Sequence, residues 1–195
     1  MEKQTDLRIL RTKQMLKDAF FELMETDGFG KITVENLTKK AFISRNTFYL
    51  HYSDKSDLLS HLEDEVLEEI RQIMGKLPDE LMQSQNELSL AAKAITIEFF
   101  QYIKANQRFF KLILAKNGDP AFLGKLGDTI RNLIHSGFPR DFLPIPDRYI
   151  AAMIVGVQTG IIREWISGGM EEAPEEIAAM LSVLIRDVPR NLSAR

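Results

Sequence analysis

Residues 31–58 constrain the fold of this chain more than any other stretch, because helix-capping residues recur in it at short intervals. Thr33 and Ser44 are residue types that cap helix N-termini, and a segment with helical spacing follows each of them. Asn36 stands where a capping box would carry Glu or Gln, so that box is imperfect. The pattern predicts two short helices joined by a three-residue turn and then a longer helix over 54–74. This arrangement is typical of a helix-turn-helix unit.

Helical spacing also recurs along the rest of the chain, and alternating β-branched runs are missing. Turn signals at Gly75, at 117–120, at 136–146 and before Pro174 separate the helical segments. We therefore expect an all-α fold of about nine helices. A helix-turn-helix domain is expected over 1–53, and a helical ligand-binding and dimerisation domain over 54–195, with 54–74 as the connecting helix.

Composition narrows the possible functions. The 195 residues are 45% hydrophobic and 27% charged, which is typical of a soluble globular protein. The chain has no cysteine, so it can form neither a disulfide framework nor a thiolate site. The N-terminus lacks a signal pattern, and no apolar run approaches the roughly 18 residues that a membrane span needs. We expect a cytoplasmic protein without membrane contact.

Catalytic signatures are also missing from the sequence. The three histidines are scattered, and there is neither a glycine-rich phosphate loop nor a His-Glu-x-x-His pattern. We expect no enzyme activity, no cofactor and no metal. The net charge of −3 argues against general affinity for nucleic acid, although 1–52 carries an excess of basic residues and the remainder an excess of acidic ones.

The segment that opens at Ser44 points to DNA. An α-helix fits the major groove, and its N-terminal turn reaches the base edges. Arg45 could bind guanine through two hydrogen bonds, and Asn46 could read adenine. The hydroxyl groups of Thr47 and Tyr49 can bond phosphates or base edges, and phosphate contacts position a protein on the duplex.

A set of nearly contiguous positions extends this interpretation: Gly28-Phe29, Ile32-Thr33-Val34, Ser44-Arg45, Thr47-Phe48-Tyr49, His51-Tyr52, Asp54-Lys55 and Asp57-Leu58-Leu59. With these residues, 8–59 resembles the N-terminal domain of the TetR/AcrR family of bacterial transcriptional regulators. The resemblance implies a dimer that binds double-stranded DNA. The DNA contacts would come from Thr33, Ser44, Arg45, Asn46, Thr47, Tyr49, His51 and Lys55.

Simpler roles are open for several of these residues. Ser44 could be only a helix cap, and His51 could either contact phosphate or pack at a helix end. Phe48 and Tyr52 lie four apart on one face, so we expect both to be mainly core. Family members often carry Gly at the position of Phe42, where a positive φ is costly for a bulky residue. Either the turn is built differently, or Phe42 accepts strain while its ring packs.

The last two helices are the expected dimer interface. The family forms its dimer through this pair, and small residues together with an apolar stripe support the same role here. The alternative is that both helices are buried within one protomer. The candidate interface residues are Ala152, Gly156, Gly160, Ile177, Met180, Leu181 and Leu184. Residues 160–177 are also similar to a subgroup that includes regulators of dihydroxyacetone kinase operons.

Aromatic residues concentrate in the middle of the chain, where a helical bundle could enclose a small-molecule effector. Plain core packing is the alternative for each of them. The candidates are Phe99, Tyr102, Phe109, Phe110, Phe122 and Trp165.

These observations lead to one functional hypothesis and one rival. The chain would be a homodimeric repressor that binds a roughly palindromic operator, and a small molecule could release it. Its recognition helices would lie about 34–36 Å apart, or somewhat more if the half-sites are more widely spaced. An activator role is the alternative that the sequence leaves open. The rival is a helical protein-interaction module without DNA binding.

Overall fold

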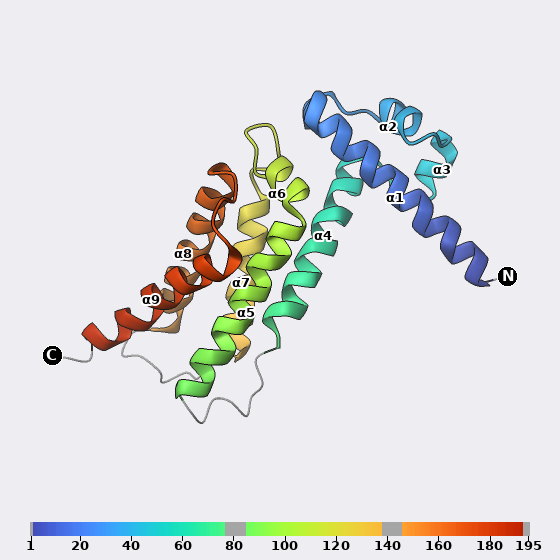
Figure 1. Ribbon diagram of the computed structural model, residues 1–195. Helices are drawn as coiled ribbons and strands as arrows, with labels where there is room; N and C mark the ends of the chain where they lie inside the picture. Colours follow the sequence, from blue (N-terminus) through green and yellow to red (C-terminus); the bar gives the residue numbers. More distant parts are fainter. Residues whose placement is uncertain (1, 77–84, 138–145, 193–195) are drawn as a thin grey trace. The chain divides into compact units, whose positions relative to one another are not determined.

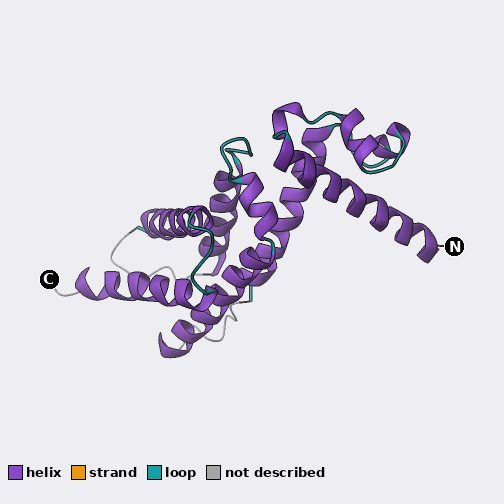
Figure 2. Ribbon diagram, turned by 45° about the horizontal axis from the view of Figure 1, so that its top comes forward, coloured by secondary structure: helices purple, strands orange, loops and turns teal. Residues whose placement is uncertain are grey.

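The computed structural model describes residues 2–76, 85–137 and 146–192, which form α-helices, one short 3-10 helix and no strand (Figures 1 and 2). This confirms the predicted all-α class. The 3-10 helix was not predicted from the sequence. In chain order the elements are α1 (Glu2–Thr26), η1 (Phe29–Lys31), α2 (Val34–Lys40), α3 (Arg45–Tyr49), α4 (Lys55–Met74), α5 (Gln85–Ala105), α6 (Gln107–Ile113), α7 (Phe122–Gly137), α8 (Asp147–Ser167) and α9 (Pro174–Leu192).

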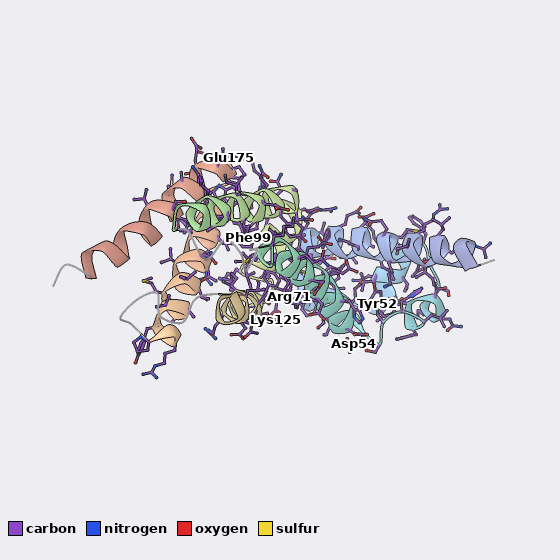
Figure 3. The ribbon with its side chains drawn as sticks, turned by 90° about the horizontal axis from the view of Figure 1, so that it is seen from below. Tyr52, Asp54, Arg71, Phe99, Lys125 and Glu175 are labelled. Atoms are coloured by element: carbon purple, nitrogen blue, oxygen red, sulfur yellow. The ribbon has the colours of Figure 1, made fainter. Side chains whose placement is uncertain are left out.

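Side-chain caps fix the starts of α2, α3 and α4. Thr33 Oγ1 accepts from the Asn36 backbone N–H at 3.1 Å, and Asn36 Oδ1 accepts from the Thr33 N–H at 2.7 Å. The amide oxygen of Asn36 thus closes the capping box that the sequence left imperfect. Ser44 Oγ caps α3 by accepting from the Thr47 N–H at 3.0 Å. Asp54, at the start of α4 (Figure 3), accepts from two backbone N–H groups at 2.7 and 2.9 Å.

The chain divides into two compact units. Unit 1 comprises Met1–Val66 together with Leu112–Pro120, and unit 2 comprises Leu67–Lys111 together with Ala121–Arg195. The division falls inside α4, so this helix contributes residues to both units. The domain boundary expected between 53 and 54 remains a prediction.

In unit 1, α1 packs against α2, and α2 packs against α3. Phe20, Leu37 and Phe48 are at most 2% exposed and form the centre of the core. The core role expected for Phe48 and Tyr52 is confirmed, since they are 0% and 4% exposed. Truncation of a buried phenylalanine to alanine costs about 3–5 kcal/mol, so this core fixes where α3 lies.

In unit 2, α5 packs against α9, and α7 packs against α8. A hydrogen bond from Gln101 Nε2 to Glu175 Oε1 at 2.7 Å links α5 to α9. Gly127 allows α8 to lie close to α7, because a Cβ there would be only 3.0 Å from Val155 Cγ1.

One helix of unit 2 differs from the sequence expectation about apolar runs. Residues Arg148–Ser167 in α8 are long and apolar enough to span a membrane, with a mean hydropathy of 1.2. The expectation was wrong because small and apolar residues outweigh the few charges when the whole helix is averaged. Core helices of soluble proteins can be equally long and apolar, so composition alone does not place α8 in a bilayer.

Candidate nucleic-acid interface

The exposed face of α3 is the centre of the candidate interface. Arg45, Asn46 and Tyr49 are all exposed, whereas Phe48 on the opposite side is fully buried. The Tyr49 ring meets Phe48 edge-to-face at 5.6 Å between centroids, and Tyr49 is still 57% exposed. The predicted reading residues therefore share one solvent-facing surface anchored by one core residue.

Arg45 has a partner on the preceding helix. Its Nη2 donates to Glu35 Oε2 at 2.8 Å, and both side chains are more than half exposed. Such an exposed pair contributes at most about 1 kcal/mol, so little free energy holds the guanidinium away from an incoming acceptor. Sequence reasoning did not identify Glu35, because residues ten apart on different helices follow no periodic spacing.

The hydroxyl groups of Thr33, Ser44 and Thr47 already have local roles. Thr33 and Ser44 are exposed N-caps, and Ser44 Oγ also lies 2.9 Å from Thr47 Oγ1. The capping role considered for Ser44 is therefore present. A capped helix start can still offer its remaining N–H groups to a phosphate, so the two roles are compatible.

The structure places His51 and Lys55 beyond α3. The His51 ring is half-buried and lies 6.3 Å from the Tyr52 ring. Lys55 Nζ donates to the carbonyl oxygens of Phe29 and Gly30 at 2.9 and 3.3 Å, and it lies 4.7 Å from the centroid of the Phe29 ring. The Lys55 side chain thus connects the start of α4 to η1. Its phosphate contact remains a prediction.

Phe42 occupies the turn between α2 and α3 with a φ of 54°, in the left-handed region. Its ring is 89% exposed, so it accepts the backbone strain without packing. Of the two alternatives that the sequence left open, the turn takes the positive φ. The ring packing that this alternative included is not present.

Charge near the start of α4 is organised around Asp57. Its Oδ2 accepts from the Ser53 backbone N–H at 2.7 Å and from the Ser53 hydroxyl at 3.1 Å. The bond from the Ser53 backbone has the largest effect in lowering the pKa of Asp57, and nearby His61 lowers it further.

Burial raises the pKa of the Tyr52 phenol, so the phenol stays neutral at the base of the interface.

The aromatic effector candidates of unit 2 fall into two packed clusters. In the first cluster, the Phe100 ring packs edge-to-face against Phe99, at 5.2 Å between centroids, and against Trp165, at 5.4 Å. The second cluster consists of Phe109, Phe110 and Phe122. All six residues are at most 5% exposed, and none of them lines the groove described next.

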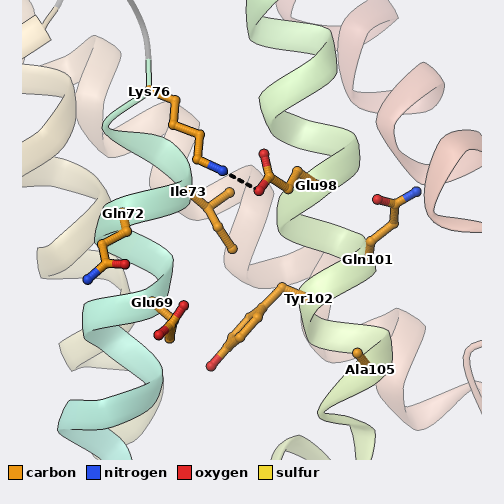
Figure 4. Close-up of a pocket in the computed structure, with 8 residues that line it drawn as sticks. All are labelled: Glu69, Gln72, Ile73, Lys76, Glu98, Gln101, Tyr102 and Ala105. Carbon is orange, nitrogen blue, oxygen red and sulfur yellow. Dashed lines mark hydrogen bonds and ion pairs between the residues drawn. The ribbon is translucent and has the colours of Figure 1, made fainter.

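Tyr102 is the predicted effector residue that lines an open groove between α4 and α5 (Figure 4). The groove measures about 400 Å³, and most of its other lining residues are polar or charged types, although more of the groove's surface is apolar than polar. Across it, the Lys76 ammonium pairs with Glu98, and the Tyr102 ring points toward Glu69. Effector binding by any of these residues remains a prediction.

The predicted dimer residues also divide into two groups. Ala152, Gly156 and Gly160 are exposed on one face of α8, and a Cβ at either glycine would meet nothing within 4 Å. On α9, Met180 is 52% exposed. Ile177 and Leu181 are 4% and 1% exposed, because α9 directs them into its own protomer. The side chain of Leu184 lies outside the described residues.

Comparisons with known proteins agree with this architecture. Residues 17–62 match the family model described as bacterial regulatory proteins of the tetR family. Residues 91–187 match a model described as a transcriptional regulator C-terminal region. The two matches together extend over most of the chain.

Individual relatives support the same assignment. An uncharacterised HTH-type transcriptional regulator, YxbF of Bacillus subtilis, is 37% identical over 101 residues, which are 49% of this chain and 25% of that protein. The chain thus spans about a quarter of the length of this relative.

Two solved structures share the fold. A TetR transcriptional regulator from Streptococcus agalactiae superposes with a TM-score of 0.68 at 18% identity, over 95% of this chain and 99% of that one. The dihydroxyacetone kinase operon activator DhaS gives 0.63 at 18% identity, over 93% and 97%. At this identity they show the fold alone, so the likeness to the dihydroxyacetone kinase subgroup remains a prediction. With both family models matched in the expected order, the chain belongs to the TetR family of bacterial transcriptional regulators.

Proposed function

We propose that this protein is a cytoplasmic, homodimeric repressor that binds a palindromic duplex through the exposed face of α3. The observation that carries the proposal is the shared surface of Arg45, Asn46 and Tyr49 above the buried Phe48. These side chains offer donors for guanine, adenine and phosphate, and the core beneath fixes their spacing.

Selection of bound fragments from a pool of random duplexes by the full chain would identify the operator. Fluorescence anisotropy with that duplex would then give the Kd as a function of salt. We expect a steep loss of affinity as salt rises. Binding to phosphates releases counterions from the DNA, and this release is less favourable when the salt concentration is high.

Arg45→Ala tests the reading face. We expect the Kd for the selected operator to rise at least about ten-fold, because a bidentate guanine contact contributes roughly 1–3 kcal/mol. Arg131→Ala is the matched control, since Arg131 is an exposed arginine of α7 that pairs with Asp128 one turn away. Equal binding by both variants would refute the assignment of α3 as the reading helix. If the wild-type chain selected no duplex at all, the interaction-module alternative would instead be favoured.

The homodimer is proposed to form through the exposed small-residue face of α8. Close approach of a partner helix needs small residues, and Gly156 has open space where a side chain would extend. We expect Gly156→Glu to convert the dimer to a monomer in light scattering. Gly124→Glu on α7 is the control, because Gly124 is also exposed and a Cβ there would meet nothing within 4 Å. A dimer that survives Gly156→Glu would place the interface elsewhere.

A small-molecule effector would regulate binding only if it bound the DNA-competent and the DNA-incompetent state of the protein with different affinities.

A reporter gene placed behind the selected operator distinguishes a repressor from an activator. A repressor would lower expression of the reporter. Increased reporter expression would instead identify an activator.

A further inference from the structure

Leu50 is an apolar side chain on the face of α3 that carries the predicted DNA contacts. It is the C-cap of that helix, with helical φ and ψ of −72° and −18°, and its N–H donates to the Asn46 carbonyl at 3.2 Å. At 3.6 residues per turn, Arg45, Asn46, Tyr49 and Leu50 lie on one side of the helix. Leu50 is therefore the apolar member of an otherwise polar face.

The Leu50 side chain contributes little to the core, because 81% of its surface is exposed. Single exposed leucines are common and need no explanation by themselves. The position of Leu50 is what distinguishes it, since it lies one helical turn beyond Asn46 and beside Tyr49 on the surface proposed to meet the duplex. Phosphate oxygens would gain nothing from an aliphatic side chain.

The major groove offers one apolar group at its base edges, the C5 methyl of thymine. We propose that Leu50 packs against a thymine methyl and makes this base pair a specificity position of each half-site. The proposal rests on the DNA-binding function stated above. One helical turn separates Cβ atoms by about 5–6 Å, and stacked bases are about 3.4 Å apart. The thymine should therefore lie one or two base pairs from the base that Asn46 contacts.

Replacement of thymine by deoxyuridine tests this contact, because uracil lacks only the methyl group. Each thymine of the selected operator would be replaced in both half-sites together, and the Kd of the full chain measured by anisotropy. Burial of one methyl group contributes about 0.8 kcal/mol, or roughly four-fold in Kd, so two half-sites give about ten- to twenty-fold. For the wild-type chain, we expect a loss of this size at one symmetry-related thymine pair.

The same scan with Leu50→Ala identifies the side chain that responds. We expect this variant to bind the thymine operator about ten-fold more weakly than the wild type and to show no further loss with deoxyuridine at that pair. Phe42→Ala is the control, because Phe42 is also highly exposed in unit 1 but lies outside α3. That variant should keep the full cost of deoxyuridine. Circular dichroism and thermal melting would verify that each variant is folded.

The outcomes separate this inference from the function on which it rests. If the wild-type chain selects no duplex, the DNA-binding proposal itself fails. If it binds and no thymine replacement weakens binding, or if Leu50→Ala retains the cost at every thymine, DNA binding stands and the role of Leu50 is refuted. Loss of the methyl dependence in Leu50→Ala alone supports it.

Discussion

Glu35 on α2 and Arg45 on α3 form an ion pair, with Arg45 Nη2 lying 2.8 Å from Glu35 Oε2. The pair joins the two helices of the helix-turn-helix through their exposed surfaces. It also places a carboxylate beside the arginine expected to read the duplex. A docked phosphate backbone would be repelled by that carboxylate.

Removal of this charge should strengthen binding. We expect Glu35→Gln to lower the Kd for any duplex about two- to five-fold at low salt, the range of an exposed charge interaction. The gain should fade at high salt because of screening. Anisotropy at two salt concentrations measures it, and Glu22→Gln, which removes the partner of Lys40, is the control. Weaker binding of the operator by Glu35→Gln would mean that the pair orients Arg45.

Strain at Phe42 predicts a stabilising substitution. A left-handed residue with a Cβ costs roughly 1–2 kcal/mol, and the backbone entropy of glycine offsets part of the gain. We expect Phe42→Gly to raise the free energy of unfolding by about 0.5–1 kcal/mol in urea denaturation followed by circular dichroism. Phe42→Ala keeps the Cβ and should show no gain. Destabilisation by glycine would indicate that the ring stabilises the turn despite its exposure.

Lys55 should act first as a structural residue. Its ammonium donates to two carbonyl oxygens of η1, and hydrogen bonds of charged groups contribute about 1.5–3 kcal/mol when buried, less when partly exposed. We expect Lys55→Met to lower the free energy of unfolding by about 1–2 kcal/mol. Lys31→Met, an exposed lysine of η1, should have little effect. Unchanged stability with a shallower salt dependence of DNA binding would show instead that Nζ leaves the carbonyls for phosphate.

The lowered pKa of Asp57 predicts a dependence of stability on pH. The folded state binds the proton more weakly than the unfolded state, so the stabilisation is present above the ordinary pKa of about 4 and is lost as pH falls through the folded value. We expect Asp57→Asn to melt at a lower temperature than the wild type at pH 7. The difference should shrink below pH of about 4. Asp64→Asn, on an exposed position of α4, should show neither effect.

The helix-turn-helix could be predicted from the sequence because its determinants are local. Thr33, Ser44 and Asp54 each cap the helix that follows within a few residues, and capping residues are readable from short spacings. The sequence left open whether the turn at Phe42 takes a positive φ, and the structure shows that it does. The exposure of the Phe42 side chain could not be predicted, because it depends on what surrounds the turn in space.

Long-range relationships were harder to predict. The apolar spacing of α9 is the same whether Ile177 and Leu181 face a partner protomer or α5, and the structure directs both inward. The aromatic residues of unit 2 likewise follow helical spacing, and only the fold shows that Phe100 meets Trp165. Glu35 and Leu50 belong to no motif, and the pairing of Glu35 with Arg45 and the exposure of Leu50 depend on the folded structure.

Unit 1, which carries the reading helix, is assembled from two separate stretches of chain. Leu112–Pro120 groups with the first 66 residues, and a Cβ on Gly28 would lie 3.5 Å from the Asn117 Cβ. A fragment cut after residue 66 would therefore be missing a piece of its own scaffold. Chimeras that graft unit 1 onto another protein should therefore include Leu112–Pro120 as well.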